Sequence, residues 1–268
     1  MDPHALQAIR QAVLPELPGF ELEWLPQIDS TNSELMRRAR AGRLEPVLLV
    51  AAEQSAGRGR LGRQWFSGAD TDASRGSDGA LTFSLGLPLA PRDWSGLSLA
   101  VGVSVVESLH PDLRLKWPND VWLRDRKLAG ILIETANLAD ITATRYAVVG
   151  VGINLKAPAA TGLRTPPAWL GEVLPGTDAA KALLRLAAPL VQALKMFEQH
   201  GFAPFQGRFN RLDALGGLAV CLSDGTEGQA QGVDSTGALL VHTAHGLKKI
   251  TSSEVSLRPL DPPPYENL

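Results

Sequence analysis

The sequence contains very little cysteine and no long apolar run. Among its 268 residues there is one cysteine, Cys221, so no disulfide can form within the chain, which fits a reducing compartment. No uninterrupted apolar stretch approaches the roughly 20 residues that a membrane-spanning helix needs. The first residues, MDPHALQAIR, lack the basic and apolar regions of a signal peptide. We therefore expect a cytoplasmic protein that does not associate with membranes.

A strong charge of either sign is also missing. Lys plus Arg number 26 and Asp plus Glu number 28, which gives a formal net charge of −2 at pH 7. No global field would therefore draw the chain to nucleic acid or to anionic lipid. No group of His, Cys and Asp residues has the spacing of a metal site, so we expect any Mg²⁺ ion to arrive with a nucleotide.

Apolar periodicity divides the chain into two parts. Up to residue 213, predicted helices at 5–14, 29–42, 95–109, 178–200 and 202–213 are interspersed with predicted strands at 20–27, 46–52, 80–87, 113–136 and 141–155. From about residue 216, five short strand-like runs are separated by Asp-Gly, Thr-Gly and His-Gly turns, a spacing typical of a small barrel. The prediction is an α+β domain over 1–213 followed by a small β-barrel over 214–268.

A glycine- and arginine-rich stretch, GRGRLGRQW at 57–65, follows a predicted strand. It contains a literal G-x-G-x-x-G, but Gly62 opens no helical pattern, so the dinucleotide interpretation fails on context. A Walker loop fails as well, because Arg63-Gln64 stands where Lys-Ser/Thr is required. A nucleic-acid tract would need a broader basic face. Glycines that let backbone N–H groups approach, with paired guanidinium donors, favour binding of a small polyanion.

Four more stretches resemble those of one family. They are DSTN (29–32), KWPND (116–120), RKLAG (126–130) and GVGIN (150–154), with GRGRLGRQW between the first two. Their order and spacing resemble the biotin protein ligases over about residues 20–258. That resemblance implies a catalytic domain similar to class II aminoacyl-tRNA synthetases, a mixed sheet flanked by helices. It also implies that biotin and ATP form biotinyl-5′-AMP and that biotin passes to a lysine of a carboxylase carrier domain.

The resemblance also implies which residues bind each substrate. Lys127 and Arg60 are the expected catalytic residues. Biotin is expected to contact Ser30, Thr31, Asn32, Gln54, Gly57, Arg58, Gly59, Arg60, Lys127, Gly130 and Gly152. ATP, with Mg²⁺, is expected to contact Arg60, Arg63, Trp65, Lys116, Asn119, Asp120, Lys127 and Asn154. The residues alone leave simpler interpretations open, because Ser30 to Asn32 could merely cap a helix and Lys127 could be an ordinary exposed lysine.

Two alternatives and several expectations about partners complete the prediction. A lipoate–protein ligase has a related catalytic domain but usually lacks the arginine loop and the small barrel. A nucleic-acid-binding adaptor has only the Arg/Gly tract in its support. Because 28 residues precede DSTN, we expect no helix-turn-helix domain and no DNA binding. The expected partner is a biotin carboxyl carrier domain, and a homodimer is left open.

Overall fold

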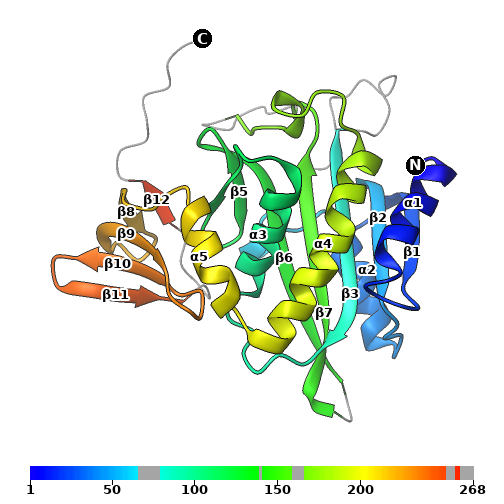
Figure 1. Ribbon diagram of the computed structural model, residues 1–268, viewed down its shortest axis with the longest axis horizontal. Coiled ribbons are helices and arrows are strands. Elements are labelled where there is room, and N and C mark those ends of the chain that lie inside the picture. Colours follow the sequence, from blue (N-terminus) through cyan, green and yellow to red (C-terminus); the bar gives the residue numbers. More distant parts are fainter. Residues whose placement is uncertain (66–78, 139–140, 159–165, 252–256, 260–268) are drawn as a thin grey trace.

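The protein is described by a computed structural model that covers residues 1–65, 79–138, 141–158, 166–251 and 257–259. A seven-stranded sheet with the order β1-β2-β3-β7-β6-β5-β4 forms its centre (Figure 1). The strands are β1 (Glu21–Ile28), β2 (Val47–Gln54), β3 (Ala80–Leu89), β4 (Arg114–Lys116), β5 (Asp120–Leu123), β6 (Arg126–Leu138) and β7 (Ile141–Asn154). Only β1 and β2 pair in parallel, so the sheet is mixed, as predicted.

Helices cover both faces of this sheet. They are α1 (Pro3–Val13), α2 (Thr31–Arg40), α3 (Leu97–Leu109), α4 (Ala179–His200) and α5 (Ala203–Leu212), with short 3-10 turns at Arg60–Gly62 and Leu170–Glu172. In Figure 1, α3 and α4 lie on the near face and α2 lies behind the sheet. The predicted α+β architecture, a mixed sheet flanked by helices, is thereby confirmed.

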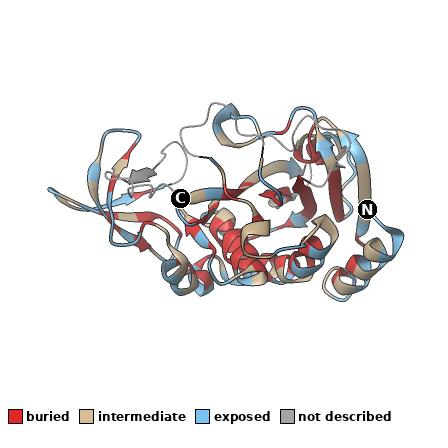
Figure 2. Cartoon of the chain, turned by 90° about the horizontal axis from the view of Figure 1, so that it is seen from above, coloured by how far each residue is buried: buried red, intermediate tan, exposed pale blue. Residues whose placement is uncertain are grey.

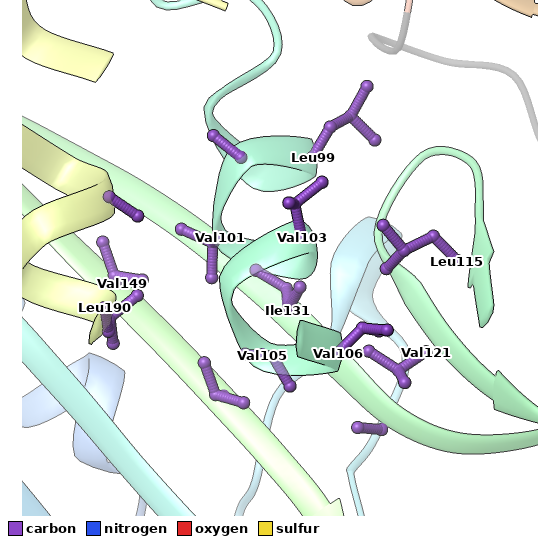
Figure 3. Packing of buried hydrophobic residues seen from close by; sticks show 14 of the residues in the cluster. Leu99, Val101, Val103, Val105, Val106, Leu115, Val121, Ile131, Val149 and Leu190 are labelled. Atoms are coloured by element: carbon purple, nitrogen blue, oxygen red, sulfur yellow. The ribbon is translucent and has the colours of Figure 1, made fainter. Parts of the chain in front are cut away.

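The central core explains why α3 is apolar almost all round. Val101 and Val103 of α3 are fully buried, between the sheet on one side and α4 on the other. Figure 3 shows the same helix beside Leu115, Ile131 and Leu190, which come from β4, β6 and α4. A helix that is hydrophobic on all sides is expected to be buried on all sides. Figure 2 shows buried residues concentrated in the sheet and the helices packed on it.

Helix α2 occupies the other face and begins beside the central strands. Its N-cap is Ser30, whose hydroxyl accepts a hydrogen bond from the Ser33 amide. Thr31 and Glu34 have the spacing of a capping box, and the sequence predicts one there. That prediction is wrong, because Thr31 is already helical and Glu34 pairs with arginines further along α2. The difference matters because the Thr31 side chain is then available to point into the sheet.

The C-terminal strands form an open sheet and not the predicted closed barrel. They are β8 (Ala219–Leu222), β9 (Glu227–Val233), β10 (Leu239–Thr243), β11 (Gly246–Ile250) and β12 (Leu257–Pro259). Their order is β11-β10-β9-β8-β12, and no pairing joins the two outer strands in the described part of the chain. The turn spacing predicted the strands correctly, but it does not determine whether the ends of a sheet meet.

The junction between the two sheets is tight. The Ala214 amide donates to the Leu115 carbonyl of β4, and Trp117 Nε1 donates to the Gly237 carbonyl in the turn between β9 and β10. Burial raises the pKa of the Asp213 carboxyl at this junction to about 6. The predicted division at residue 213 stays a prediction. Among the described helices none is both long and apolar enough to cross a bilayer.

Candidate active site

A cavity opens beside the start of α2, where the middle strands of the large sheet carry polar residues and glycines. We call it the central cavity. Its walls come from α2, the ends of β2 and β5, strands β3, β6 and β7, and the segment 55–65, here called the glycine loop. It is lined by Ser30, Thr31, Asn32, Gln54, Arg58, Gly59, Arg60, Arg63, Gln64, Trp65, Thr82, Phe83, Asn119, Asp120, Lys127, Gly130, Ile131, Leu132, Gly150, Val151 and Gly152.

One end of the cavity, the hydroxyl end, is a neutral hydrogen-bonded network. The Thr31 amide donates to Gln54 Oε1 at 2.8 Å, and the Thr31 hydroxyl lies 3.1 Å from the same oxygen. Ser84 Oγ of β3 lies 2.7 Å from Thr31 Oγ1 and 2.6 Å from Asn32 Oδ1. Ser30, Thr31, Asn32 and Ser84 are all nearly inaccessible to solvent. Buried polar groups with this many partners are held in fixed positions, which suits recognition of a polar ring.

The glycine loop is a small hairpin that lies over the cavity. The Trp65 amide donates to the Gly57 carbonyl and the Gly59 amide to the Arg63 carbonyl. At its tip Leu61 and Gly62 have φ values of 56° and 70°, the left-handed region that a leucine rarely adopts. Backbone strain of this kind is common in loops that clamp ligands. No helix opens at Gly62, in agreement with the rejection of a dinucleotide fold.

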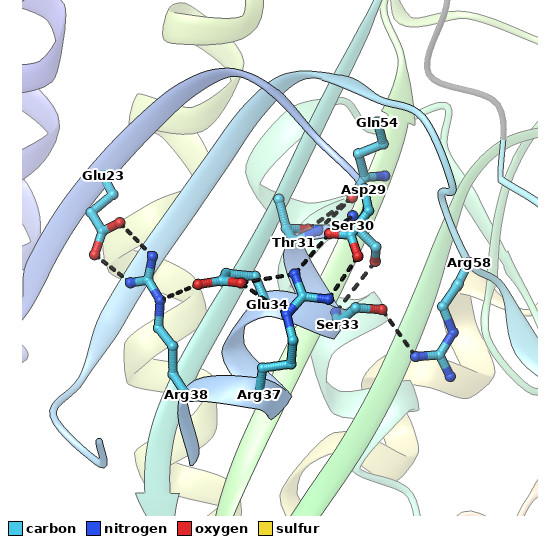
Figure 4. A network of polar contacts seen from close by, with 10 residues as sticks. All are labelled: Glu23, Asp29, Ser30, Thr31, Ser33, Glu34, Arg37, Arg38, Gln54 and Arg58. Carbon is cyan, nitrogen blue, oxygen red and sulfur yellow. Dashed lines mark hydrogen bonds and ion pairs between the residues drawn. The ribbon is translucent and has the colours of Figure 1, made fainter. Parts of the chain in front are cut away.

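Arg58 anchors the glycine loop to the rest of the site. Its guanidinium donates to Glu134 of β6 at 3.0 Å and to the Ser33 hydroxyl of α2 at 3.2 Å. Figure 4 shows Arg58 reaching Ser33 at the start of α2, beside the Asp29–Arg37 pair. Asp29 accepts hydrogen bonds from both terminal nitrogens of Arg37, and this guanidinium lowers the pKa of the Asp29 carboxyl to about 2.

The opposite side, the charged end, gathers cationic groups around one carboxylate. Lys127 Nζ lies 2.7 Å from Asp120 Oδ1, and Arg60 Nη1 donates to Asn119 Oδ1 at 3.4 Å. Burial, with the neighbouring charge of Arg63, lowers the pKa of the Arg60 guanidinium, while Asp120 opposes the shift. A site in which burial disfavours positive charge gains most from an anion, because the anion restores the charge balance.

Glycines in β6 and β7 form the floor of the cavity. A Cβ on Gly152 would lie 2.4 Å from the Trp65 indole, and a Cβ on Gly150 would lie 2.0 Å from Asn32 Oδ1. Neither strand position has room for a Cβ unless the neighbouring Asn32 or Trp65 side chain moves, which explains glycine here despite its poor fit to sheets. The Trp65 indole N–H is buried with no hydrogen-bond partner among the described residues. It leaves one donor beside the cavity that a ligand could satisfy.

Most predicted site residues come together here. Of those expected, Gly57, Lys116 and Asn154 do not line the cavity. Asn154 is buried and donates to the Ala168 carbonyl, while the Lys116 ammonium lies 4.6 Å from the centre of the Trp122 ring. Gly57 supports the hairpin, because a Cβ there would lie 2.4 Å from the Trp65 carbonyl oxygen.

Two polar residues of this network, Ser84 and Glu134, were not found by sequence reasoning. Both lie in strands of ordinary composition, ALTFSLGL and ILIETA, with no motif around them. The only signal was a polar residue within an otherwise apolar buried strand, which requires a hydrogen-bond partner.

No group of three or more His, Cys, Asp or Glu side chains in the described part of the chain is placed to hold a metal ion. The oxygens of Asn119 and Asp120 nevertheless fit the usual mode of Mg²⁺, which keeps several waters and binds phosphates plus one or two carboxylates. The residues therefore fit an ion that enters with a nucleotide.

Comparisons with known proteins agree with this geometry. Residues 24–154 match the biotin/lipoate A/B protein ligase family, and residues 207–258 match the biotin protein ligase C-terminal domain. The chain is 35% identical over 271 residues to the bifunctional ligase/repressor BirA of Escherichia coli, covering 96% of this chain and 80% of that protein. It is 33% identical to the biotin–[acetyl-CoA-carboxylase] ligase of Paracoccus denitrificans, covering 86% of this chain and 98% of that protein.

A solved structure extends the similarity to the fold. The biotin protein ligase of Aquifex aeolicus, in complex with biotin and ATP, superposes with a TM-score of 0.72 at 32% identity. The alignment covers 89% of this chain and 99% of that one. The two regions matched by the family models, 24–154 and 207–258, contain nearly all of the large sheet and of the C-terminal sheet respectively. The chain belongs to the biotin protein ligase family.

Proposed function

We propose that the protein is an ATP-dependent biotin–protein ligase. In the first step the biotin carboxylate attacks the α-phosphorus of ATP, the bond to pyrophosphate breaks, and biotinyl-5′-AMP forms. In the second step a lysine amine of a carrier domain attacks the acyl carbon, loses a proton, and releases AMP. The observation that carries this proposal is the pairing, in one cavity, of a fixed neutral network with a cluster of cations.

The hydroxyl end suits the ureido ring of biotin. That ring has two N–H donors and one carbonyl acceptor, and Ser30, Thr31 and Asn32 supply hydroxyl and amide groups in a buried, ordered arrangement. Gln54 holds the Thr31 amide and lines the same wall. A lipoyl ring has no N–H group, so such a network would be left unsatisfied by lipoate. The relatives from Paracoccus denitrificans and Aquifex aeolicus reported above are likewise named as biotin ligases.

The charged end suits the reacting anions. Carboxylate and triphosphate repel each other, so their approach requires fixed positive charge directed at the transition state. Lys127 lies between Asp120 and Gly130, beside the cavity floor, and we assign it to the biotin carboxylate and the α-phosphate. Arg60 and Arg63 of the glycine loop complete the charge around the phosphates. Asn119 and Asp120 are assigned to the nucleotide and its Mg²⁺.

The remaining assignments are part of the same proposal. The Trp65 indole lies over Gly152, with its ring centre 6.0 Å from Lys127 Nζ, and is assigned to the adenylate. Gly59 and Gly130 allow the ligand to approach the backbone. Asn154 and Lys116 are assigned supporting roles, since neither lines the cavity.

The macromolecular partner is proposed to be a biotin carboxyl carrier domain with one exposed lysine. The Paracoccus denitrificans relative is named for acetyl-CoA carboxylase. We further propose that the enzyme does not bind DNA, since its formal net charge is −2.

The test is direct. The purified chain is mixed with ATP, Mg²⁺, a carrier domain, and either labelled biotin or labelled lipoate. We expect ATP-dependent labelling of one carrier lysine by biotin and none by lipoate. Labelling by lipoate alone would favour the related ligase, and labelling by neither would overturn the proposed function.

A further inference from the structure

Glu134 connects two parts of the central cavity that are distant in sequence. One carboxylate oxygen accepts from Arg58 of the glycine loop at 3.0 Å, and the other accepts from Asn32 Nδ2 at 3.0 Å. Its side chain is only 22% exposed. The same Asn32 amide also donates to the Leu132 carbonyl, at 3.3 Å. The carboxylate and the carbonyl can only accept, so together they fix which way the Asn32 amide faces.

The direction of every hydrogen bond beyond Asn32 then follows from counting protons. The amide oxygen of Asn32 can only accept, so Ser84, 2.6 Å away, donates its single proton to it. Ser84 has no proton left for Thr31 Oγ1 at 2.7 Å, and two hydroxyl oxygens this close need a proton between them, so the Thr31 hydroxyl donates to Ser84. Gln54 Oε1 lies farther from the hydroxyl, at 3.1 Å, and already accepts from the Thr31 amide. Thr31 Oγ1 has thereby used its own proton, and it meets the cavity as a hydrogen-bond acceptor.

We infer that Glu134 is a positioning residue for substrate recognition: through Asn32 and Ser84 it fixes the Thr31 hydroxyl as an acceptor for an N–H group of the ligand. Through Arg58 the same carboxylate holds the glycine loop over that ligand. The inference rests on the proposed function, because the N–H donor that would bind to the Thr31 acceptor is the ureido ring of biotin. Gly150 belongs to the same device, since only a glycine leaves room for the Asn32 amide.

Replacing Glu134 by glutamine should remove this constraint. If the glutamine oxygen accepts from Arg58, its NH₂ group faces the Asn32 NH₂ group, donor against donor. The Leu132 carbonyl still favours the original Asn32 orientation, so Asn32 either moves away or turns over with a poor contact to that carbonyl. In both cases Ser84 loses its fixed acceptor, its proton can turn to Thr31, and it then occupies a lone pair with which Thr31 would accept from the ligand.

The experiment measures selectivity. Calorimetric titration gives the Kd of biotin and of an analogue whose two ureido N–H groups are replaced by oxygen. We expect the wild type to prefer biotin strongly and Glu134→Gln to reduce the ratio of the two Kd values at least about tenfold, the size of one buried hydrogen bond. Glu23→Gln is the matched control. Glu23 is also partly exposed and paired with an arginine, Arg38, but it lies on β1 outside the cavity, and the ratio should not change.

A second variant separates this chain from a general loss of structure. Ser84→Ala interrupts the chain between Asn32 and Thr31 and leaves the Glu134–Arg58 pair intact. Ser84→Ala should lower the ratio of the two Kd values, and adding Glu134→Gln should lower it no further. Ser84 and Glu134 are not in contact with each other, but both act on Thr31 through the same series of hydrogen bonds, which passes through Asn32. Unchanged selectivity in both single variants, or strictly additive effects of the two substitutions, would overturn the inference. If the wild type still bound biotin, the proposed function would be unaffected by that result. No biotin binding by the wild type would overturn both.

Discussion

The two ends of the central cavity achieve order in different ways. At the hydroxyl end, Thr31, Asn32 and Ser84 are buried and hydrogen-bonded to one another. At the charged end, Lys127 is 43% exposed and its ammonium is paired with Asp120. A neutral network can be preassembled in a low-dielectric interior, whereas a cluster of like charges needs an opposing anion. We therefore expect the side chains of the hydroxyl end to keep their positions when biotin binds, whereas the cations of the charged end need the phosphates to balance their charge.

The largest expected effect lies at the charged end. If Lys127 neutralises the carboxylate and α-phosphate, Lys127→Ala should slow adenylate formation by roughly 10²–10³, the size of the loss when one preorganised electrostatic donor is deleted. The measurement is biotin-dependent release of pyrophosphate. The control is Lys181→Ala, which removes an exposed lysine that pairs with Asp178 on α4 and should leave the rate unchanged. A full adenylation rate in Lys127→Ala would remove the role assigned to it.

The second effect concerns retention of the intermediate. Arg60 belongs to the glycine loop, so Arg60→Gly should remove a charge that holds biotinyl-AMP and should speed its release by about ten- to a hundredfold, as expected for hydrogen bonds to charged groups. Escaped adenylate would label accessible lysines of unrelated proteins, which streptavidin blotting detects. Leu61→Gly is the control, because it adds backbone freedom at the loop tip and keeps every arginine. Equal off-target labelling by Arg60→Gly and wild type would contradict the assignment.

How far the sequence could predict this comparison differs between the ends. The residues of the charged end belong to contiguous motifs: GRGRLGRQW, KWPND and RKLAG predicted Arg60, Asn119, Asp120 and Lys127, and the structure brings these four residues together in the central cavity. The hydroxyl end depends on single residues of separate strands, Ser84 of β3 and Glu134 of β6. Their partnership with Asn32 is set by strand order and register, which no local pattern encodes. For the same reason the turn spacing predicted the C-terminal strands but not their open arrangement.

A third, smaller effect tests whether biotin binding depends on the position of Asn32 at the hydroxyl end. In Gly150→Ala the new methyl carbon would lie 2.0 Å from Asn32 Oδ1, so Asn32 must move. Overpacking of this kind destabilises by typically 1–3 kcal/mol, and biotin binding should weaken with it. Denaturant unfolding and biotin titration measure the two quantities. Gly207→Ala in α5 is the matched control: only Arg211 Nη1, at 3.7 Å, is near its new methyl, and a helical alanine should stabilise by roughly 0.5–1 kcal/mol.

The smallest expected effect is on stability and comes from an exposed ion pair outside the cavity, Asp29–Arg37, next to the hydroxyl end. Asp29 precedes Ser30, and Arg37 lowers the Asp29 pKa from 3.8 to about 2. A carboxyl whose pKa is lower in the folded state stabilises the fold above its unfolded pKa, and this contribution is lost as the pH falls through the folded pKa. Because the side chains of Asp29 and Arg37 are 42% and 50% exposed, solvent screens the pair, and its contribution should stay below about 1 kcal/mol.

Asp29→Asn should therefore be less stable than wild type at pH 7 by that small amount, and the gap should close between about pH 4 and pH 2, where the wild-type carboxyl takes up its proton. Urea unfolding at a series of pH values measures it. Asparagine keeps an oxygen for the Ser30 amide, which Asp29 Oδ1 now accepts at 2.7 Å, so biotin affinity should hardly change. A loss of biotin affinity as large as that expected for Gly150→Ala would show that the hydroxyl end is not held in place by its own hydrogen bonds alone but depends on the Asp29–Arg37 pair.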